Sequence, residues 1–560
     1  MIMTKNKLSY LFALMGIVAM ANSSCKKQLQ IGNPNSPTLS GNVADESGLI
    51  SLAEGGVYEN GFADGDGWLG NSYFSLPYGY MELMADNIGA DASNNQITTV
   101  GYPTYFIMDD GTKITNGSPS VSILRAYNIL GGSGNNPLFF QWQNMYALNA
   151  ACNKVIQVLP TIKFSGDATS RMNTVLAWCY WWKGFAYSQV GTMYYSGLIQ
   201  DSGTNATNNH YLPKDSILAR SNYYLNLAAT TINGISSSSD YNTILGELIP
   251  PVYQVQNGGV LTPTMWIHNI NSLLARNIID NGLAPYVNGN PNASITKAST
   301  GNLTADDWNN IVTLASNGIQ SGDYVFTAQS TATNSIFTAG GGNVAANTTG
   351  NNISSTFKIS VRFVANFKAT DKRLAQNFWQ GSVYNNPFYG TPYNIADSLS
   401  QSTTGVAILG NKLVGGYQVY IGPTYEENEL MLAEANIRLG NIATGLSHVD
   451  NVRTYQGAGV ASVSGTVTTL AGAMAELTAE SRVSLFGRGL SFYGARRWGW
   501  IYDISNGGGQ YGQLLYNADG TWDTNVTVDY NFMDYWDIPA DETQLNPPAS
   551  GTSPILNPNY

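Results

Sequence analysis

Tyr425-Glu-Glu-Asn-Glu-Leu-Met-Leu-Ala-Glu-Ala-Asn-Ile-Arg-Leu-Gly440 is the stretch that decides the fold class of this 560-residue chain. Its apolar side chains recur at spacings of three and four, which predicts an amphipathic helix, and Gly440 is a typical C-terminal stop. A second helix is predicted directly after it, over 442–455. The apolar stripes of the two helices are Leu430, Ala433 and Ile437, then Leu446, Val449 and Val452.

Five other segments carry the same helical periodicity: 139–159, 168–190, 214–232, 262–279 and 304–319. Asp215 or Ser216 is the expected cap of the third, and Thr262 with Pro263 begins the fourth. Helices of this length with short linkers form antiparallel hairpins. The small-residue-rich hairpin at 425–455 resembles a tetratricopeptide unit, and stacked units of this kind bury a common core.

The chain between these helices is rich in turn residues. Two long loop insertions are predicted, at about 88–138 and 327–424, with a strand inside the second at 357–367. Residues 471–500 form one last amphipathic stretch, and polar turns follow to Tyr560. We therefore predict a mainly α fold of tetratricopeptide-like helical hairpins, with long irregular loops and minor β structure, in a single domain over 49–560.

The N-terminal residues have the pattern of an exported, lipid-anchored protein. Lys5 and Lys7 precede an apolar run of 14 residues, which is too short for a membrane-spanning helix of about 20 residues. Cys25 follows small residues, so 1–24 is predicted to be a lipoprotein signal peptide, Cys25 the site of lipid attachment and 25–48 a tether. An ordinary secretory signal with a chance cysteine is the alternative.

Charge and cysteine content constrain the partners and the chemistry of the chain. The net charge is −11, which makes nucleic acid an unfavourable partner. Cys152 and Cys179 lie in helix-like runs, which favours two buried free thiols and leaves a disulfide open.

No catalytic or metal-binding pattern is present. The histidines His210, His268 and His448 are far apart and lack metal-ligand spacing, so no metal site is predicted. Asp306-Asp307 stands at a helix start, where acids interact favourably with the helix dipole. Neither this pair nor Asp109-Asp110 implies the carboxylate separation of about 5–9.5 Å that a glycosidase needs. We expect no cofactor.

Six short segments, in order, resemble the SusD/RagB family of Bacteroidetes outer-membrane lipoproteins. They are Asn33-Pro-Asn-Ser-Pro-Thr38, Trp142 to Asn153-Lys-Val-Ile156, Glu426 to Asn436 with Leu439-Gly440, Val449-Asp-Asn-Val-Arg453, Arg482 to Arg496-Arg-Trp-Gly499, and Asp537 to Tyr560. The resemblance implies a non-enzymatic protein that binds oligosaccharide at the cell surface. It also implies attachment to the outer membrane through the lipid, and delivery to a SusC-like TonB-dependent transporter.

Ligand contact is expected from exposed rings on loops, because sugar C–H faces lie flat on aromatic side chains. The candidates are Tyr102, Tyr105, Trp379, Tyr384 and Tyr389, in the two regions where the resemblance implies the binding face. Trp142, Trp178, Trp182 and Trp308 stand on helical stripes and are predicted to be core residues.

Two other functions fit the same residues. A secreted helical glycoside hydrolase would share the acidity, the aromatic residues and the helices. The same fold could also bind peptides or glycopeptides.

Overall fold

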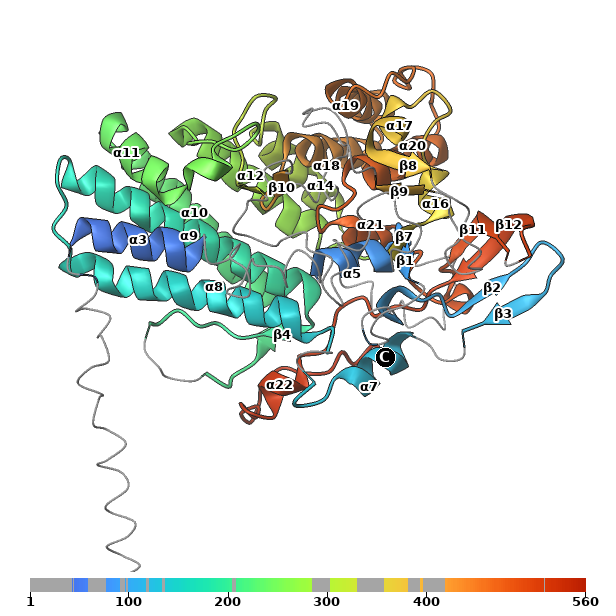
Figure 1. Cartoon of the computed structure of the whole chain (residues 1–560), viewed down its shortest axis with the longest axis horizontal. Coiled ribbons are helices and arrows are strands. Elements are labelled where there is room, and N and C mark those ends of the chain that lie inside the picture. The colour runs from blue at the N-terminus through green and yellow to red at the C-terminus, as the bar shows by residue number, and fades with distance from the viewer. Residues whose placement is uncertain are drawn as a thin grey trace, which may run out of the picture.

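The computed structural model describes residues 43, 45–58, 77–90, 96, 99–116, 120–132, 136–203, 208–284, 303–329, 357–380, 393–395, 418–517 and 519–560. Within these ranges the protein is mainly α-helical, as predicted, with long helices at one end and a small β-sheet at the other (Figure 1). Among the helices in these ranges, none combines the length and the apolar character that crossing a bilayer requires.

The first group of helices surrounds α9 (Ala168–Met193), which packs between its neighbours α8 and α10 (Figure 1). Asp167 caps α9 by accepting a hydrogen bond from the Ser170 backbone N–H at 2.8 Å. At Gly184 a Cβ atom would lie 2.7 Å from the Leu225 side chain, so glycine allows α10 to approach closely. The other members are α3 (Glu46–Val57), α8 (Phe139–Val158), α10 (Lys214–Asn233), α11 (Ser238–Leu248) and α12 (Pro263–Ile279).

Aromatic side chains form the core of this group. Trp181 contacts Trp182 with ring centroids 4.6 Å apart, and Phe326 packs on Trp181 at 4.4 Å. Trp178 and Trp266 join them, and all of these rings are buried. The four tryptophans predicted to be core residues are buried, which confirms that prediction: Trp142, Trp178, Trp182 and Trp308.

The second group of helices is organised around α18 (Tyr425–Arg438), the helix predicted most clearly by the sequence. Its predicted stripe is buried, and Gly440 has φ +87°, which a C-terminal glycine adopts without strain. A Cβ atom at Gly445 would lie 2.7 Å from the Ala433 carbonyl oxygen, so glycine lets α19 pack tightly on α18. The other helices are α14 (Ala305–Ser316), α19 (Ile442–Tyr455), α20 (Leu470–Ser484) and α21 (Ser491–Trp498).

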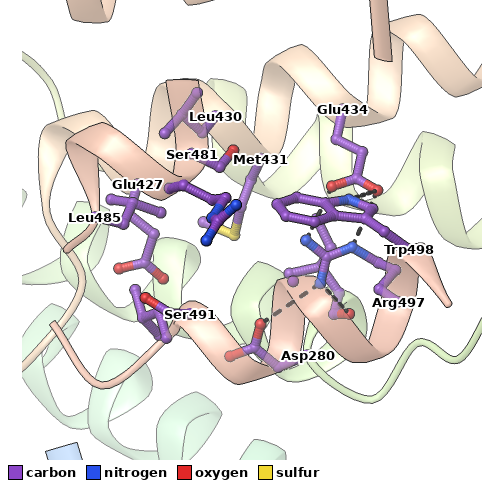
Figure 2. Close-up of a pocket in the computed structure, with 14 residues that line it drawn as sticks. Asp280, Glu427, Leu430, Met431, Glu434, Ser481, Leu485, Ser491, Arg497 and Trp498 are labelled. Atoms are coloured by element: carbon purple, nitrogen blue, oxygen red, sulfur yellow. Dashed lines mark hydrogen bonds and ion pairs between the residues drawn. The ribbon is translucent and has the colours of Figure 1, made fainter. Parts of the chain in front are cut away.

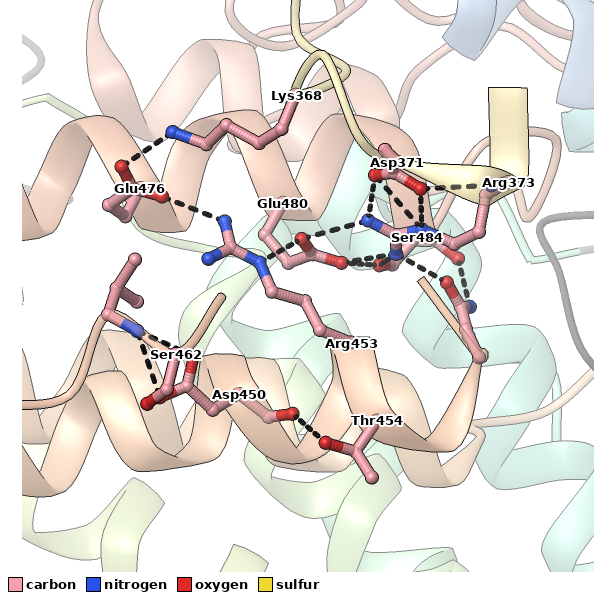
Figure 3. Close-up of polar contacts among 12 residues, drawn as sticks. Lys368, Asp371, Arg373, Asp450, Arg453, Thr454, Ser462, Glu476, Glu480 and Ser484 are labelled. Carbon is pink, nitrogen blue, oxygen red and sulfur yellow. Dashed lines mark hydrogen bonds and ion pairs between the residues drawn. The ribbon is translucent and has the colours of Figure 1, made fainter. Parts of the chain in front are cut away.

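The second group is also tied together by buried ion pairs. Arg373 donates to Asp371 at 2.7 Å and to Glu480 at 2.6 Å (Figure 3). Arg453 of α19 reaches the same Glu480 at 2.8 Å and Glu476 at 2.8 Å (Figure 3). Each carboxylate is matched by an arginine, which is the condition under which buried charges are tolerated.

The largest sheet lies at the far end of the molecule from α3 and α11 (Figure 1). Its strand order is β11-β12-β2-β3, and all its neighbouring strands are antiparallel. The strands are β2 (Tyr105–Ile107), β3 (Lys113–Thr115), β11 (Gln510–Tyr516) and β12 (Trp522–Asp529). The smaller pairs are β1 (Ile88–Ala90) with β7 (Phe357–Ile359), β4 (Ser196–Gly197) with β5 (Leu212–Pro213), β10 (Gln418–Tyr420) with β6 (Thr327–Gln329), and β8 (Phe378–Gln380) with β9 (Tyr393–Ile395).

Several predicted boundaries were wrong. The stretch 88–138 is not loop throughout, because it contains β1, β2, β3 and α7 (Ser120–Tyr127). The strand predicted over 357–367 ends at Ile359, since the Ser360 side chain caps the helix α16 (Val361–Val364). Neither Asp215 nor Ser216 caps α10, which begins at Lys214 after Pro213.

The C-terminal region differs most from the prediction. Gly487 and Gly489 have φ of +71° and +70°, so 471–500 is two helices, α20 and α21, and not one stretch. The polar turns predicted after residue 500 contain the hairpin of β11 and β12. The remaining elements are α5 (Pro77–Met84), α17 (Lys372–Asn377), α22 (Ala540–Thr543) and the 3₁₀ turns Thr99–Gly101, Leu159–Thr161, Pro251–Tyr253 and Ile504–Asn506.

Candidate functional site

A cavity of about 50 Å³ lies among α12, α18, α20 and α21 (Figure 2). Its charged lining comes from Asp280, Glu427, Glu434, Arg482 and Arg497, and Figure 2 shows Trp498 beside the Glu434–Arg497 pair. The Arg497 guanidinium donates to Glu434 at 2.9 Å, and Arg276 donates to Glu427 at 2.5 Å. Each of these two glutamates is therefore engaged by an arginine from another element.

The protein environment lowers the pKa of Glu434 and raises the pKa of Asp280 in this cavity. Burial works to raise the pKa of Glu434, but the charges of Arg497 and Arg438 outweigh it, and the pKa lies below its ordinary value. Burial raises the pKa of Asp280 to about 7, because Arg497 is 4.0 Å away and compensates only in part. The pKa values of Glu434 and Asp280 are thus shifted in opposite directions.

The size of the cavity limits what it can hold. A volume of about 50 Å³ is room for a few water molecules, because one water needs roughly 10–15 Å³ on this measure. The paired glutamates are held by arginine. We therefore assign this cavity to the framework of the fold.

Tyr105 and Tyr102 are the predicted ligand residues that the structure describes most fully. Tyr105 is half-buried on β2, and the Lys113 ammonium lies 3.4 Å from the centre of its ring. Burial, with the charges of Asp529 and Asp503, raises the pKa of Tyr105 to about 12. Tyr102 is also half-buried, just before β2, and its backbone N–H donates to Thr99 O at 3.2 Å. Tyr105 is therefore the first residue of β2, and Tyr102 lies in the segment that leads into it.

Of the other predicted residues, only Trp379 lies within the described ranges. Trp379 lies on β8, where its backbone is paired with Asn394 of β9. Tyr384, Tyr389 and the predicted lipid site Cys25 lie outside the described residues. Of the five predicted rings, the structure describes the surroundings of Tyr102 and Tyr105, on and just before β2.

Sequence reasoning missed three rings on the sheet that carries Tyr105. Tyr511 and Trp522 are exposed, and Tyr516 packs against Trp522 with ring centroids 4.8 Å apart. The signal was present in Asn517-Ala-Asp-Gly520, a turn sequence between two segments with β-branched and aromatic residues. Reading the region after 500 as polar turns concealed it.

The histidines and cysteines are in structural settings. His268 Nδ1 is 2.8 Å from Asp323, and His448 Nδ1 is 2.9 Å from Glu429. Cys152 and Cys179 are buried free thiols, as the sequence favoured. Within the described ranges no three His, Cys, Asp or Glu side chains gather as a metal site would require.

Known proteins resemble this chain in three-dimensional structure but not detectably in sequence. No family model matches the chain, and no curated protein matches its sequence. A SusD superfamily protein of Bacteroides vulgatus ATCC 8482 matches with TM-score 0.54 and 15% identity, over 92% of this chain and 99% of that one.

The chain has a SusD-like fold.

Two further solved structures share the SusD-like fold. A putative sugar binding protein of the same organism has TM-score 0.51 and 13% identity, over 90% of this chain and 95% of the other. A structure solved with xylogluco-oligosaccharide has TM-score 0.53 and 13% identity, over 91% and 99%. The aligned regions cover nearly the whole of each chain, so the similarity concerns the complete architecture and not one hairpin.

Proposed function

We propose that this protein binds oligosaccharides without cleaving them and delivers them to a SusC-like TonB-dependent outer-membrane transporter. The observation that carries the proposal is the SusD-like fold over nine-tenths of the chain, shared with a protein solved with xylogluco-oligosaccharide. Half-buried and exposed aromatic rings on the sheet supply the chemistry, because flat rings stack on sugar faces.

Tyr102 and Tyr105 are the proposed contact residues in the part of the protein that the structure describes. Tyr105 offers a partly exposed ring, one face of which the Lys113 ammonium covers, and a hydroxyl that can act as a hydrogen-bond donor. Trp379, Tyr384 and Tyr389 remain predicted contacts from the second loop region. Together they would form a face of stacking rings with polar neighbours.

The absence of catalysis is part of the proposal. A hydrolase needs one free carboxylic acid and one free carboxylate on opposite sides of the bond. In the cavity of Figure 2, Glu427 and Glu434 are each engaged by an arginine, and Asp280 is the other carboxyl group. This arrangement favours a binding protein over the alternative of a helical glycoside hydrolase.

The N-terminal sequence and the SusD-like fold support the proposed location and partner. We propose attachment to the outer membrane through acylated Cys25, with the folded domain on the outer face. Replacing Cys25→Ser should release the protein from the membrane fraction. Retention of the variant in that fraction would contradict lipidation at Cys25.

The test of binding is a screen on protein that lacks residues 1–25, with glycan and peptide arrays and a parallel assay for hydrolysis. We expect glycan binding without turnover, and weaker binding for Tyr105→Ala. Turnover of an oligosaccharide would support the hydrolase, and binding confined to peptides would support the peptide alternative. Purification of the full-length protein from membranes should recover a large β-barrel partner.

A further inference from the structure

One face of the four-stranded sheet carries a row of aromatic side chains. The buried Val528 is paired with Gln510 of β11 and with Phe106 of β2, so these residues define the inner face. Tyr105 and Tyr511 are their strand neighbours and therefore point to the opposite, outer face. Leu515 is buried, so the next residue, Tyr516, and its partner Trp522 also lie on the outer face.

Two of these outer rings are largely exposed. Tyr511 is 55% exposed and Trp522 is 47% exposed, whereas Trp178, Trp181 and Trp182 of α9 are buried. Trp522 packs on one side against Tyr516, with an angle of 57° between the rings. Tyr105 is already covered by the Lys113 ammonium. Tyr511 and Trp522 are therefore the rings that present open surface to a ligand.

The position of these rings is rigid. The Asp109 carboxylate, in the turn between β2 and β3, accepts hydrogen bonds at 2.8 Å from the backbone N–H groups of Thr524 and Asn525. The Asp109 backbone N–H donates in return to Asp523 at 3.1 Å. The two hairpins are thus fastened to each other beside Trp522, and little conformational entropy is lost when a ligand binds.

Spacing and area indicate the kind of ligand. Tyr511 and Tyr516 are five positions apart on β11, which corresponds to about 15 Å at roughly 3.3 Å per residue. Four strands about 4.8 Å apart give an outer face of roughly 200–300 Å². A stable protein partner needs about 800 Å² on each side, so the face suits an elongated small ligand better than a protein.

The charges around the face narrow the ligand further. Asp503 and Asp529 lie near Tyr105, and Lys113 is already placed over the Tyr105 ring. An anionic chain would be repelled by this surface.

We propose that the outer face of this sheet is a binding surface for a neutral oligosaccharide, with Tyr511 and Trp522 as its stacking platforms. The proposal rests on the proposed function, because it extends the contact region of Tyr105 along β11 and β12. It makes the protein selective for chain length, since a ligand must cover about 15 Å to reach both rings.

The test is native electrophoresis through gels that contain xyloglucan, arabinoxylan, glucomannan, pullulan or the anionic homogalacturonan. The variants are Tyr511→Ala/Trp522→Ala and the aromatic rescue Tyr511→Phe/Trp522→Phe. The matched control is Tyr223→Ala/Tyr324→Ala, which removes two rings that are 50% and 40% exposed elsewhere. Thermal melts confirm that every variant is folded.

We expect at least one neutral polysaccharide to retard the wild type. The double alanine variant should then lose about tenfold or more in apparent affinity, because two stacking contacts of about 1 kcal/mol each are removed. The phenylalanine variant and the control should behave as the wild type does. If homogalacturonan is the only polysaccharide that retards the wild type, the proposal that the ligand is neutral is wrong.

The outcomes separate the two proposals. A wild type that no gel retards would overturn the proposed function and this surface with it. A wild type that is retarded equally with its double alanine variant would overturn the surface and leave the function standing. If the double alanine variant keeps its retardation but no longer co-purifies with a membrane β-barrel, the face binds a protein and the oligosaccharide surface is wrong.

Discussion

The two aromatic regions of this protein use the same side chains in opposite ways. Around α9, Trp178, Trp181 and Trp182 are buried among other rings and fill the space between helices. At the other end of the molecule, Tyr511 and Trp522 stand exposed on a rigid sheet. The contrast teaches that an aromatic-rich composition divides into core and surface according to the element that carries each ring, because helical stripes face neighbouring helices and sheets have two faces.

The largest loss of stability is expected for a substitution at Trp182, in the aromatic core around α9. The substitution Trp182→Ala should lower the free energy of unfolding by about 3–5 kcal/mol, because a large cavity is left among Trp178, Trp181 and Phe326. Urea titration followed by circular dichroism measures this change. Trp142→Ala, at another buried ring, should also destabilise strongly. A loss below about 1 kcal/mol at Trp182 would contradict the assignment of this region as the core.

The ion network of Figure 3 should give the next largest effect. Arg373→Ala leaves Asp371 and Glu480 without their shared partner and should cost about 3 kcal/mol, in line with the breaking of a buried pair. Lys368→Ala is the matched control, because this lysine is 45% exposed while it pairs with Glu476 of the same network. The control should cost less than about 1 kcal/mol.

Equal losses of unfolding free energy for Arg373→Ala and Lys368→Ala would show that burial does not set the strength of these ion pairs. Urea titration under the same conditions as for the tryptophan variants allows this direct comparison.

The parts of the fold that the sequence predicted are those that depend on local patterns. Helices such as α9 and α18 were predicted because a stripe of apolar residues at helical spacing, a cap and a stop are local signals. The hairpin of β11 and β12 was missed, since its strands contain bulges and few continuous alternations. Pairing of β12 with β2, about 420 positions earlier, is a tertiary event that no local pattern reveals.

The candidate site was predictable only in part, for a related reason. Tyr105 was chosen because it lies among turn residues, and the structure leaves its ring half-buried. Tyr511 and Trp522 come to the same face through long-range strand pairing. The acids of α18 illustrate the same point, because Glu427 and Glu434 look solvent-exposed in sequence and are buried by arginines of α12 and α21.

A third prediction concerns pH and the buried acids of the helical body. Burial raises the pKa of Glu82 from its ordinary 4.5 to about 7, despite hydrogen bonds from Asn87, Ser491 and Gly487. Between these values the unfolded chain releases the proton while the folded protein keeps it, so stability falls as the pH rises from 4.5 to 7. Asp280 acts in the same direction. The melting temperature should therefore be higher at pH 5.5 than at pH 8.

The variant Glu82→Gln tests the origin of this pH dependence. It removes one titrating group and should reduce the difference in unfolding free energy between pH 5.5 and 8 by about 1–3 kcal/mol. Calorimetry at the two pH values, with Glu542→Gln as a control, measures the change. A wild type whose melting temperature rises from pH 5.5 to pH 8 would contradict the prediction.

The smallest change in stability is expected at the exposed ring, where the comparison with the core is sharpest. Trp522→Ala removes a side chain of the same type as Trp182, but this ring already contacts water and packs mainly against Tyr516. The free energy of unfolding should change by less than about 0.5–1 kcal/mol, as at other surface positions. A loss as large as that at Trp182, measured by urea titration, would show that the ring supports the fold. A ring that affects oligosaccharide binding but not unfolding has a role that stability alone does not explain, and this pair of measurements separates a binding surface from a piece of core that lies near the solvent.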